Sequence, residues 1–319
     1  MASAPRISVI MPTYNRAAAV RLCLTALAEQ TVPPEAFEVV VVDDGSRDDT
    51  EAAAASRPEL NVKYVWQQNA GANAARNRGV EHAAAPLLLF INDDTIAAPG
   101  LLGAHLDTHA AARDPHVAVL GRMTIHPDYA DSPFSPLHHD ASFAPLAGQE
   151  AVHWTSFFTC NVSVKSAFLA QVGGFDPALR WHEDIELGER MHQHGLQLLY
   201  RPEALGYHWH LLDEGQLLRI AEREGEALVR WWHSRPDLLE TLRGLGLSGP
   251  APLHRPLRHG LADAAFAVTG ERLPLRLAEV AAPVSPRLAR MIWRKVFQAH
   301  KRRAIATALK TLEREKGTA

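Results

Sequence analysis

Short apolar runs and polar clusters alternate along the first 120 residues of this 319-residue chain. Short apolar runs bounded by polar residues predict buried strands, and the longer stretches between them have helical spacing. The expected strands are 7–11, 37–42, 62–66, 87–91 and 117–120, and the expected helices are 17–29, 48–56, 72–84 and 99–112. This alternation predicts an α/β fold with a mostly parallel central sheet and helices on both of its faces.

The pattern changes after the fifth expected strand. Residues 122–152 contain four prolines and little periodicity, and a loop this long in a compact domain is usually functional or mobile. Helical spacing returns at 184–194 and 211–232. We therefore expect a catalytic domain at 1–235 and a helical C-terminal extension at 236–319.

The fourth expected strand leads directly into Asn92, Asp93 and Asp94. Burying carboxylates there without a partner is costly. Oxygen ligands suit Mg²⁺ or Mn²⁺, which commonly bridge a substrate diphosphate, and ligands of open α/β sheets bind at the carboxyl ends of the strands. The segment therefore predicts a metal and nucleotide site, with an ordinary polar turn as the alternative.

Three further polar clusters follow strands or open helices, at 12–16, 43–46 and 69–79. Taken singly, each is compatible with turn or helix-cap chemistry. Because polar residues after successive parallel strands line one crevice, the clusters together predict a single site.

These clusters, in order and together with Val172–Asp176 and the Glu183–Asp184 pair, resemble glycosyltransferase family 2, whose members are inverting, nucleotide-sugar-dependent enzymes of GT-A fold. The resemblance covers 6–210. It implies a Rossmann-like GT-A catalytic domain followed by a C-terminal helical region. It also implies a UDP-, dTDP- or GDP-sugar donor, Mn²⁺ or Mg²⁺ as cofactor, and a glycan or lipid-linked acceptor.

The resemblance also implies roles for single residues on the donor side. The implied nucleotide-binding residues are Pro12, Thr13, Tyr14, Arg16, Asp43, Asp44, Asn69, Gly71, Arg76 and Asp93. Carboxylates suit this role because they accept hydrogen bonds from a pyrimidine N–H or from ribose hydroxyls. Asp94 is the implied metal ligand, joined by His208 or, as second choice, His210, which period two places on the same face of a strand. Asn92 departs from the aspartate of the family pattern and is a weaker, neutral ligand.

On the acceptor side, the resemblance implies that the catalytic residues are Asp184 and Glu183. Asp184 would be the general base that takes the proton of the acceptor hydroxyl. The alternative is that both carboxylates only complement a helix dipole. Trp181, His182 and Asn161 are expected to line the acceptor site, although Trp181 could equally be packed.

Composition and charge limit the binding partners and the cellular location that we expect. The formal net charge of −3 gives no electrostatic case for nucleic-acid binding. Two cysteines make no disulfide framework, and no apolar run reaches the roughly 18 residues that span a bilayer. We expect a cytoplasmic protein. Residues 287–316 carry ten Lys or Arg. We expect packing on the catalytic domain or a homodimer contact for this segment, with peripheral contact with the inner face of the plasma membrane as the alternative.

The sequence therefore predicts an inverting glycosyltransferase of cell-surface polysaccharide or glycoconjugate synthesis. Two alternatives stay open. The first is a polyprenyl-phosphate sugar synthase, although the Asn92 motif departs from the pattern of that group. The second is a non-catalytic nucleotide-binding partner subunit, which the presence of Asp184 beside Asp93 and Asp94 disfavours.

Overall fold

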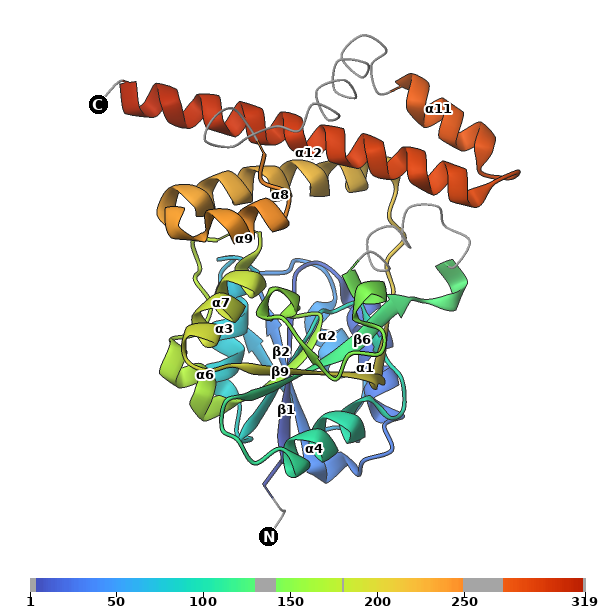
Figure 1. Cartoon of the computed structure of the whole chain (residues 1–319). Helices are drawn as coiled ribbons and strands as arrows, with labels where there is room; N and C mark the ends of the chain where they lie inside the picture. The colour runs from blue at the N-terminus through green and yellow to red at the C-terminus, as the bar shows by residue number, and fades with distance from the viewer. Residues whose placement is uncertain (1–3, 130–141, 180, 249–271, 318–319) are drawn as a thin grey trace. The chain divides into compact units, whose positions relative to one another are not determined.

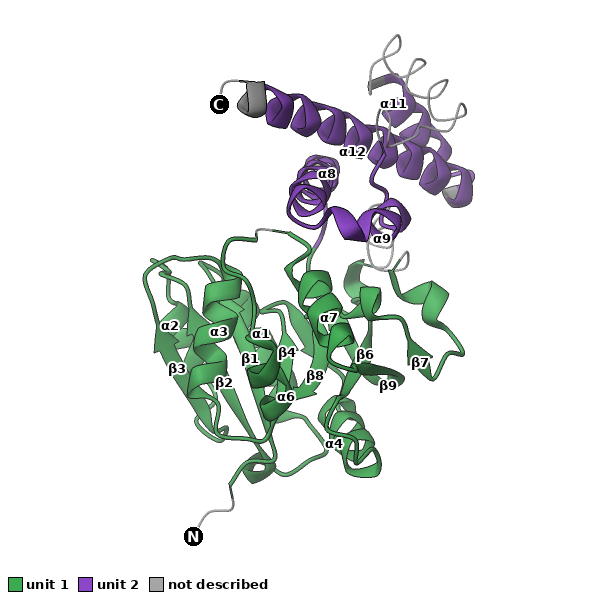
Figure 2. Cartoon of the chain, turned by 60° about the vertical axis from the view of Figure 1, so that its left-hand side comes forward, with its two compact units in different colours: residues 1–130, 139–210 green, residues 131–138, 211–319 purple. Residues whose placement is uncertain are grey.

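The computed structural model describes residues 4–129, 142–179, 181–248 and 272–317. Its described residues fall into two compact units, which divide between His210 and Leu211 (Figure 2). The sequence predicts a boundary at residue 235. The structure places it earlier because helix α8 (Glu214–Ser234) packs against helix α12 (Pro286–Gly317) and so belongs with the C-terminal helices.

The first unit is built on one mixed sheet (Figure 1), and its strands follow the order β3-β2-β1-β4-β8-β6-β9-β5, with β7 paired to β9. Its strands are β1 (Ile7–Thr13), β2 (Phe37–Asp43), β3 (Val62–Trp66), β4 (Leu87–Ile91), β5 (Thr95–Ala97), β6 (Val117–Ile125), β7 (Ala151–Val152), β8 (Asn161–Lys165) and β9 (Gln197–His208). Strands β1 to β4 are mutually parallel, whereas β8 runs antiparallel to both β4 and β6. The parallel half carries the predicted polar clusters.

Helices cover both faces of this sheet, as the alternation of strands and helices predicted. They are α1 (Ala17–Ala28), α2 (Thr50–Ala54), α3 (Ala72–His82), α4 (Leu101–Ala111), α6 (Ser166–Val172) and α7 (Glu183–Gln193). On β1, Val9 packs with the core beneath α1, α2 and α4, whereas Ile10 packs with the core beneath α6 and α7. Successive side chains of a strand point to opposite faces, so one apolar strand supplies both cores.

Close packing of α3 on the sheet depends on Gly79. A Cβ atom at this position would lie 2.5 Å from Cγ2 of Ile10 on β1. Only glycine allows the helix to approach the strand this closely. The close approach holds α3, which carries Arg76, against the middle of the sheet.

The described residues of the second unit form the α-helices α8, α9 (Leu239–Gly244), α11 (Arg272–Ala281) and α12. Helix α8 begins with a capping box formed by Asp213 and Gln216, and Trp293 and Val296 of α12 pack in a core with α11. Among the helices of the described residues, none combines the length and the apolar composition that crossing a bilayer requires.

Candidate active site

The predicted polar clusters meet at the carboxyl ends of the parallel strands. Thr13, the last residue of β1, lies opposite Asp43, the last residue of β2, and β1 also pairs with β4, which leads into Asp93 and Asp94. Parallel strands end at the same edge of a sheet, so clusters far apart in the sequence come together here.

Asp93 and Asp94 are buried and share one arginine. Arg16 places its Nη1 3.4 Å from Asp93 Oδ1 and its Nη2 2.9 Å from Asp94 Oδ2. Thr13 Oγ1 donates to Asp93 Oδ2 at 2.8 Å, and His208 Nε2 lies 3.4 Å from Asp94 Oδ2. Three of the predicted donor-side residues, Thr13, Arg16 and His208, therefore meet around this pair of carboxylates, and the predicted metal ligands Asp94 and His208 are in contact.

The two carboxylates differ in their proton affinity. Burial is the main cause that raises the pKa of Asp93 to about 6, despite the opposing charge of Arg16. Burial also disfavours the charged form of Asp94, but His208 and Arg16 outweigh it and hold its pKa below its usual range. Asp94 therefore stays anionic near neutral pH, as a ligand for a cation must.

Asp94 also has an oxygen to offer a cation. Its Oδ1 is buried and has no hydrogen-bond partner among the described residues. Carboxylate oxygens suit Mg²⁺ and Mn²⁺, so the side chains present fit such an ion. Three or more metal-binding side chains do not gather anywhere in the described part of the chain. A bound ion would therefore take its other ligands from water and from a diphosphate.

Asp43 and Asp44 shape the loop that leads to α3. Asp43 accepts hydrogen bonds from Ser46 N at 2.7 Å and Tyr64 Oη at 2.7 Å. Asp44 accepts from Gly71 N at 2.9 Å, and also from Ala70 N and the Gln67 amide. Both carboxylates thus have internal partners that fix their position.

The other predicted nucleotide-binding residues near this edge differ in exposure. Tyr14 is 48% exposed, and Asn69 is exposed as well. Pro12 is half-buried, and Gly71, with a φ of +96°, opens α3 in a backbone conformation that favours glycine.

Arg76 contacts the Glu183–Asp184 pair through Glu183, whereas the family resemblance implies a place near the base or the diphosphate. Its guanidinium pairs with Glu183, with Nη1 3.0 Å from Oε1, and its Nη2 lies 3.4 Å from Asn92 Oδ1. Arg76 therefore contacts both the Asn92–Asp94 motif and the Glu183–Asp184 pair, which are far apart in the sequence.

Asp184 sits in the first turn of α7. Ile185 N donates to its Oδ1 at 2.8 Å, and Thr159 N lies 3.5 Å from its Oδ2. Burial raises its pKa to about 7, with a further increase from the charge of Glu183 and an opposing effect of Arg76. A carboxyl group with this pKa can accept a proton near neutral pH.

The residues before α7 form a tight turn. His182 has a left-handed backbone, with a φ of +60°, which is uncommon for a residue other than glycine. This conformation directs the chain into the helix, so that Glu183 and Asp184 occupy its first turn. Trp181 is half-buried beside them, where a ligand can still reach it.

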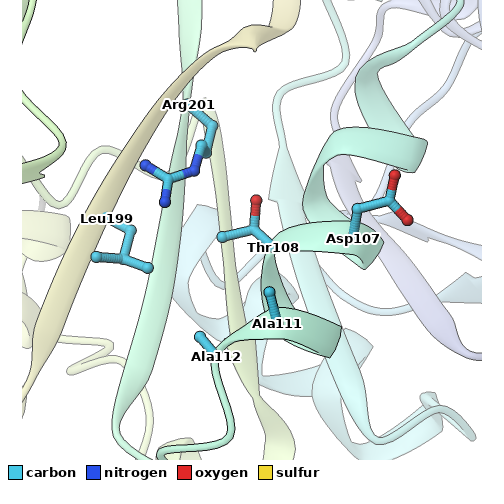
Figure 3. Close-up of a pocket in the computed structure, with 6 residues that line it drawn as sticks. All are labelled: Asp107, Thr108, Ala111, Ala112, Leu199 and Arg201. Atoms are coloured by element: carbon cyan, nitrogen blue, oxygen red, sulfur yellow. The ribbon is translucent and has the colours of Figure 1, made fainter.

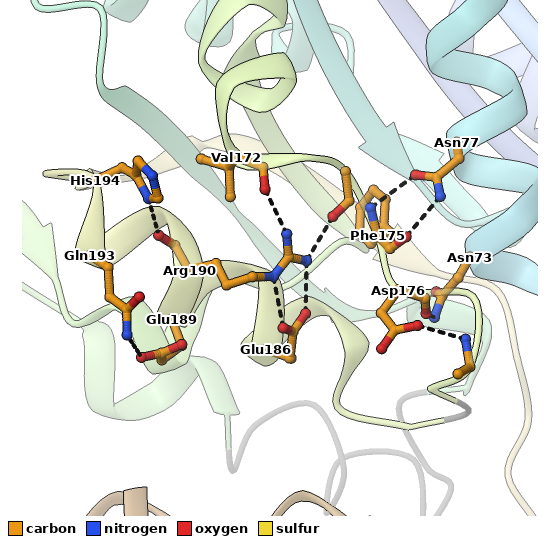
Figure 4. Close-up of polar contacts among 12 residues, drawn as sticks. Asn73, Asn77, Val172, Phe175, Asp176, Glu186, Glu189, Arg190, Gln193 and His194 are labelled. Atoms are coloured by element: carbon orange, nitrogen blue, oxygen red, sulfur yellow. Dashed lines mark hydrogen bonds and ion pairs between the residues drawn. The ribbon is translucent and has the colours of Figure 1, made fainter. Parts of the chain in front are cut away.

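A loop that the sequence analysis did not assign to the site is anchored from two sides (Figure 4). Asn73 Nδ2 donates to the carbonyls of Asp176 and Leu179, at 2.9 and 3.0 Å, and Asn77 bonds both the N–H and the carbonyl of Phe175. The signal in the sequence is spacing, because Asn73 and Asn77 are four residues apart and so lie on one face of α3.

Arg190 of α7 holds the same loop from its other side. Its guanidinium donates to the carbonyls of Val172 and Gly174 and pairs with Glu186 (Figure 4). Residues 172–179 are therefore tied both to α3, which carries Arg76, and to α7, which carries Asp184.

The acceptor assignment of Asn161 is wrong. The residue lies in β8 and is fully buried. Its side-chain amide donates to the carbonyls of Arg122 and Ala204, and its Oδ1 lies 2.9 Å from His105 Nε2. Because the side chain is turned into the sheet and fully engaged there, it has nothing to offer an acceptor.

A separate depression of about 410 Å³ lies between α4 and β9 (Figure 3). It is lined by Asp107, Thr108, Ala111, Ala112, Leu199 and Arg201. None of these belongs to the predicted site, and only two of them, Asp107 and Arg201, are charged. The depression therefore adds nothing to the chemistry of the carboxylates.

Comparison with known proteins finds similar glycosyltransferases. The family model described as "Glycosyl transferase family 2" matches residues 8–159. Two relatives from Streptomyces hygroscopicus, subspecies limoneus and jinggangensis, are each named validoxylamine A glucosyltransferase and are 36% identical to this chain. These alignments cover 63% of this chain and 51% and 55% of the relatives, so the chain spans about half the length of these proteins.

Solved structures share the fold. A mannosyltransferase from Pyrobaculum calidifontis, in complex with GDP-Man and Mn²⁺, matches with a TM-score of 0.62 at 22% identity, over 93% of this chain and 86% of that one. TarS 1-349 from S. aureus, in complex with UDP-GlcNAc, matches with a TM-score of 0.59 at 18% identity, over 93% and 89%. The expected GT-A fold is confirmed. Residues 8–159, which hold the donor-side motifs, match glycosyltransferase family 2, and the chain is similar to named glycosyltransferases.

Proposed function

We propose that this protein is an inverting glycosyltransferase that moves a sugar from a nucleoside-diphosphate sugar to a hydroxyl acceptor. The observation that carries the proposal is the position of Arg76, which contacts both Asn92 and Glu183. The strand-end carboxylates of the donor side and the carboxyl pair of the acceptor side therefore belong to one site. The names of the relatives, all glycosyltransferases, support the same reaction.

On the donor side, the nucleotide would lie along the carboxyl ends of β1 and β2. Tyr14 exposes its ring there, where a base can stack, and Asp43 and Asp44 retain lone pairs for ribose hydroxyls or a base N–H. Arg16 has a partly exposed guanidinium that reaches Asp93 and Asp94, which places a positive charge where a diphosphate would bind.

We assign the cation to Asp94 and His208. When bound, a Mn²⁺ or Mg²⁺ ion would stabilise the negative charge of the departing nucleoside diphosphate. The proposal is supported by the buried, unpartnered Oδ1 of Asp94 and by the Mn²⁺ in the complex of the related mannosyltransferase.

On the acceptor side, we assign the general base to Asp184. Its carboxylate takes the proton of the acceptor hydroxyl while that oxygen attacks the anomeric carbon of the donor. The bond between the anomeric carbon and the diphosphate breaks in the same displacement, so the configuration at this carbon inverts. Trp181 and His182, which precede Asp184, would face the acceptor.

The test is transfer from a panel of nucleotide sugars in the presence of Mn²⁺. UDP-, dTDP- and GDP-linked sugars are offered with three acceptors: validoxylamine A, a lipid-linked sugar and a polyprenyl phosphate. We expect metal-dependent release of one nucleoside diphosphate and a product of inverted anomeric configuration, identified by NMR. Product formation only with the polyprenyl phosphate would favour the synthase alternative. Nucleotide binding without turnover of any donor would favour a non-catalytic subunit.

We also propose that the C-terminal helices contact an anionic membrane, such as the inner face of the plasma membrane, and thereby approach a lipid-linked acceptor. Val284, between α11 and α12, is 87% exposed, and exposed apolar side chains flank it on both helices. The neighbouring Arg287 and Arg290 are exposed too, and cationic groups beside apolar side chains suit an anionic lipid surface better than a second copy of this basic segment.

A further inference from the structure

Arg76 is a buried cation with partners on three elements. It is 5% exposed, and its Nη1 contacts Glu183 Oε1 at 3.0 Å and Asn73 Oδ1 at 3.1 Å. Its Nη2 lies 3.4 Å from Asn92 Oδ1, and the guanidinium carbon is 5.6 Å from the ring centre of Phe175. A cation this deeply buried needs a compensating charge, and Glu183 supplies it.

The contacts of Arg76 leave few of its N–H groups free to bind a nucleotide. Both terminal nitrogens already have protein partners, and the one donor without a hydrogen-bond partner among the described residues, Nε, is buried. Of the two adjacent carboxylates, Arg76 contacts only Glu183. The carboxylate of Asp184 receives backbone N–H groups from Ile185 and Thr159. Its remaining lone pairs are therefore available for an acceptor hydroxyl.

Two adjacent carboxylates repel each other when both are ionised, and the repulsion raises the proton affinity of at least one of them. The charged and titratable groups acting on Asp184 are Glu183 and Arg76, and the thiol of Cys160 lies close by. Asn92 is neutral, so it does not compete with Glu183 for the charge of Arg76. The positive charge of Arg76 therefore pairs with Glu183, the neighbour of the proposed base Asp184.

We propose that Arg76 is a positioning residue of the general base and not a nucleotide ligand: it holds Glu183 as an ion pair and so keeps Asp184 ionised at working pH. The inference rests on the proposed function, since it assigns a role in the same site. It also explains why a family motif residue expected on the donor side is turned toward α7.

The test compares pH profiles of kcat/KM for the full-length protein and four variants. In Arg76→Met, the midpoint of the acidic limb moves to higher pH by about 1 unit or more, because the charge opposing Glu183 is lost. In Glu183→Gln the midpoint moves to lower pH, in Arg76→Met/Glu183→Gln it returns toward the wild-type value, and Arg76→Lys restores most of the original midpoint. Arg78→Met is the matched control, because Arg78 lies on the same helix but forms an exposed pair with Glu81.

Nucleotide binding, measured by calorimetry with the nucleoside diphosphate alone, distinguishes the two roles of Arg76. We expect Arg76→Met to change this affinity by less than about threefold, whereas loss of a diphosphate ligand would cost about tenfold or more. An unchanged acidic midpoint in Arg76→Met, or a tenfold loss of nucleotide affinity, would overturn the inference. If Arg76→Met fails to fold by circular dichroism, Glu183→Gln decides alone: no downward shift of its midpoint overturns the inference.

A measurement without turnover separates this inference from the proposed function. The ¹³C carboxyl resonance of Asp184, identified by its loss in Asp184→Asn, is titrated in wild type and in Arg76→Met. An upward shift of its midpoint in Arg76→Met, in a protein that transfers no sugar from any donor, supports the positioning role while the proposed function fails. No shift in a protein that does transfer sugar leaves the proposed function standing and ends the inference.

Discussion

The two carboxyl pairs of the site, Asp93–Asp94 and Glu183–Asp184, each have an arginine, but the arginines are used differently. Arg16 is partly exposed and contacts both carboxylates of the first pair. Arg76 is buried and contacts only Glu183 of the second. Despite burial, His208 and Arg16 hold the pKa of Asp94 below its usual range, whereas burial and Glu183 raise the pKa of Asp184 to about 7 against the effect of Arg76.

The comparison shows that chemically similar carboxylates acquire different proton affinities from the burial and the charges around them. At Asp94, the charges of His208 and Arg16 outweigh burial and favour the anionic state that a cation site requires, whereas Asp93, which also contacts Arg16, has a pKa raised to about 6. At Asp184, burial and the charge of Glu183 outweigh Arg76, so this carboxyl group can gain and lose a proton near neutral pH. The predictions below test whether the two pairs divide the chemistry in this way.

The largest effect is expected at the first pair. Asp94→Ala removes the anion assigned to the metal, and we expect kcat to fall by about 10⁴-fold, since a metal at a leaving group contributes several kcal/mol. Mn²⁺ binding, followed by electron paramagnetic resonance, should be lost as well. Asp107→Ala, at an exposed carboxylate of α4, is the control. Unchanged Mn²⁺ binding in Asp94→Ala would show that the cation site lies elsewhere.

A substitution in the second pair, Glu183–Asp184, should lower activity without changing Mn²⁺ binding. Asp184→Asn removes the base, and we expect kcat to fall by about 10³-fold while Mn²⁺ and nucleotide affinity stay unchanged. In wild type, activity is full above the pKa of about 7 and declines as pH falls through it, because protonated Asp184 cannot accept a proton. Full transferase activity in Asp184→Asn would refute the assignment of the base.

The pH dependence of folding stability must be known before the decline of activity at low pH, the acidic limb of the pH profile, is assigned to Asp184. His105 and His109 are buried around Ser163, and burial lowers the pKa of each to about 4. The folded state therefore binds fewer protons than the unfolded chain, whose histidines titrate near about 6.5. Stability is full above about pH 6.5 and falls by a few kcal/mol as pH drops toward 4.

Urea denaturation between pH 8 and pH 4.5 measures this loss. His105→Gln should flatten the dependence on pH, although it lowers stability at every pH, whereas His233→Gln, at an exposed histidine of α8, should not change the slope. A loss of stability that begins above pH 7 in wild type would mean that the acidic limb reports unfolding and not Asp184.

The smallest effect concerns the second unit, which holds neither carboxyl pair. We expect the intact protein to co-sediment with vesicles containing anionic lipid, and Val284→Asp to weaken this binding several-fold without changing transfer to a soluble acceptor. Thr311→Asp, on an exposed position of α12, adds the same charge as a control. Equal, negligible sedimentation of all three proteins would end the membrane proposal, and dimerisation detected by light scattering would favour a contact between copies.

The sequence by itself determined the parallel half of the sheet, β1 to β4, and the edge at which the predicted polar clusters lie. A strand that is apolar on both of its sides, such as Leu87–Ile91, requires a sheet whose two faces are both covered. The alternation of strands and helices along the chain makes such strands parallel. Polar residues that follow such strands must then meet at one edge. For this reason the order of strands and polar clusters along the chain is enough to bring Thr13, Asp93 and Asp94 together.

Only the tertiary structure decided which groups face each other across that edge. Spacing along the chain does not show that Arg76 reaches Glu183 and not a diphosphate, because the contact depends on how α3 and α7 pack. Nor does it show that the side chain of Asn161 is buried against His105 and the carbonyls of Arg122 and Ala204, because these partners come from segments far apart in the chain. Local pattern fixes which elements form and where they end, whereas the partner of a charge depends on contacts between segments about a hundred residues apart.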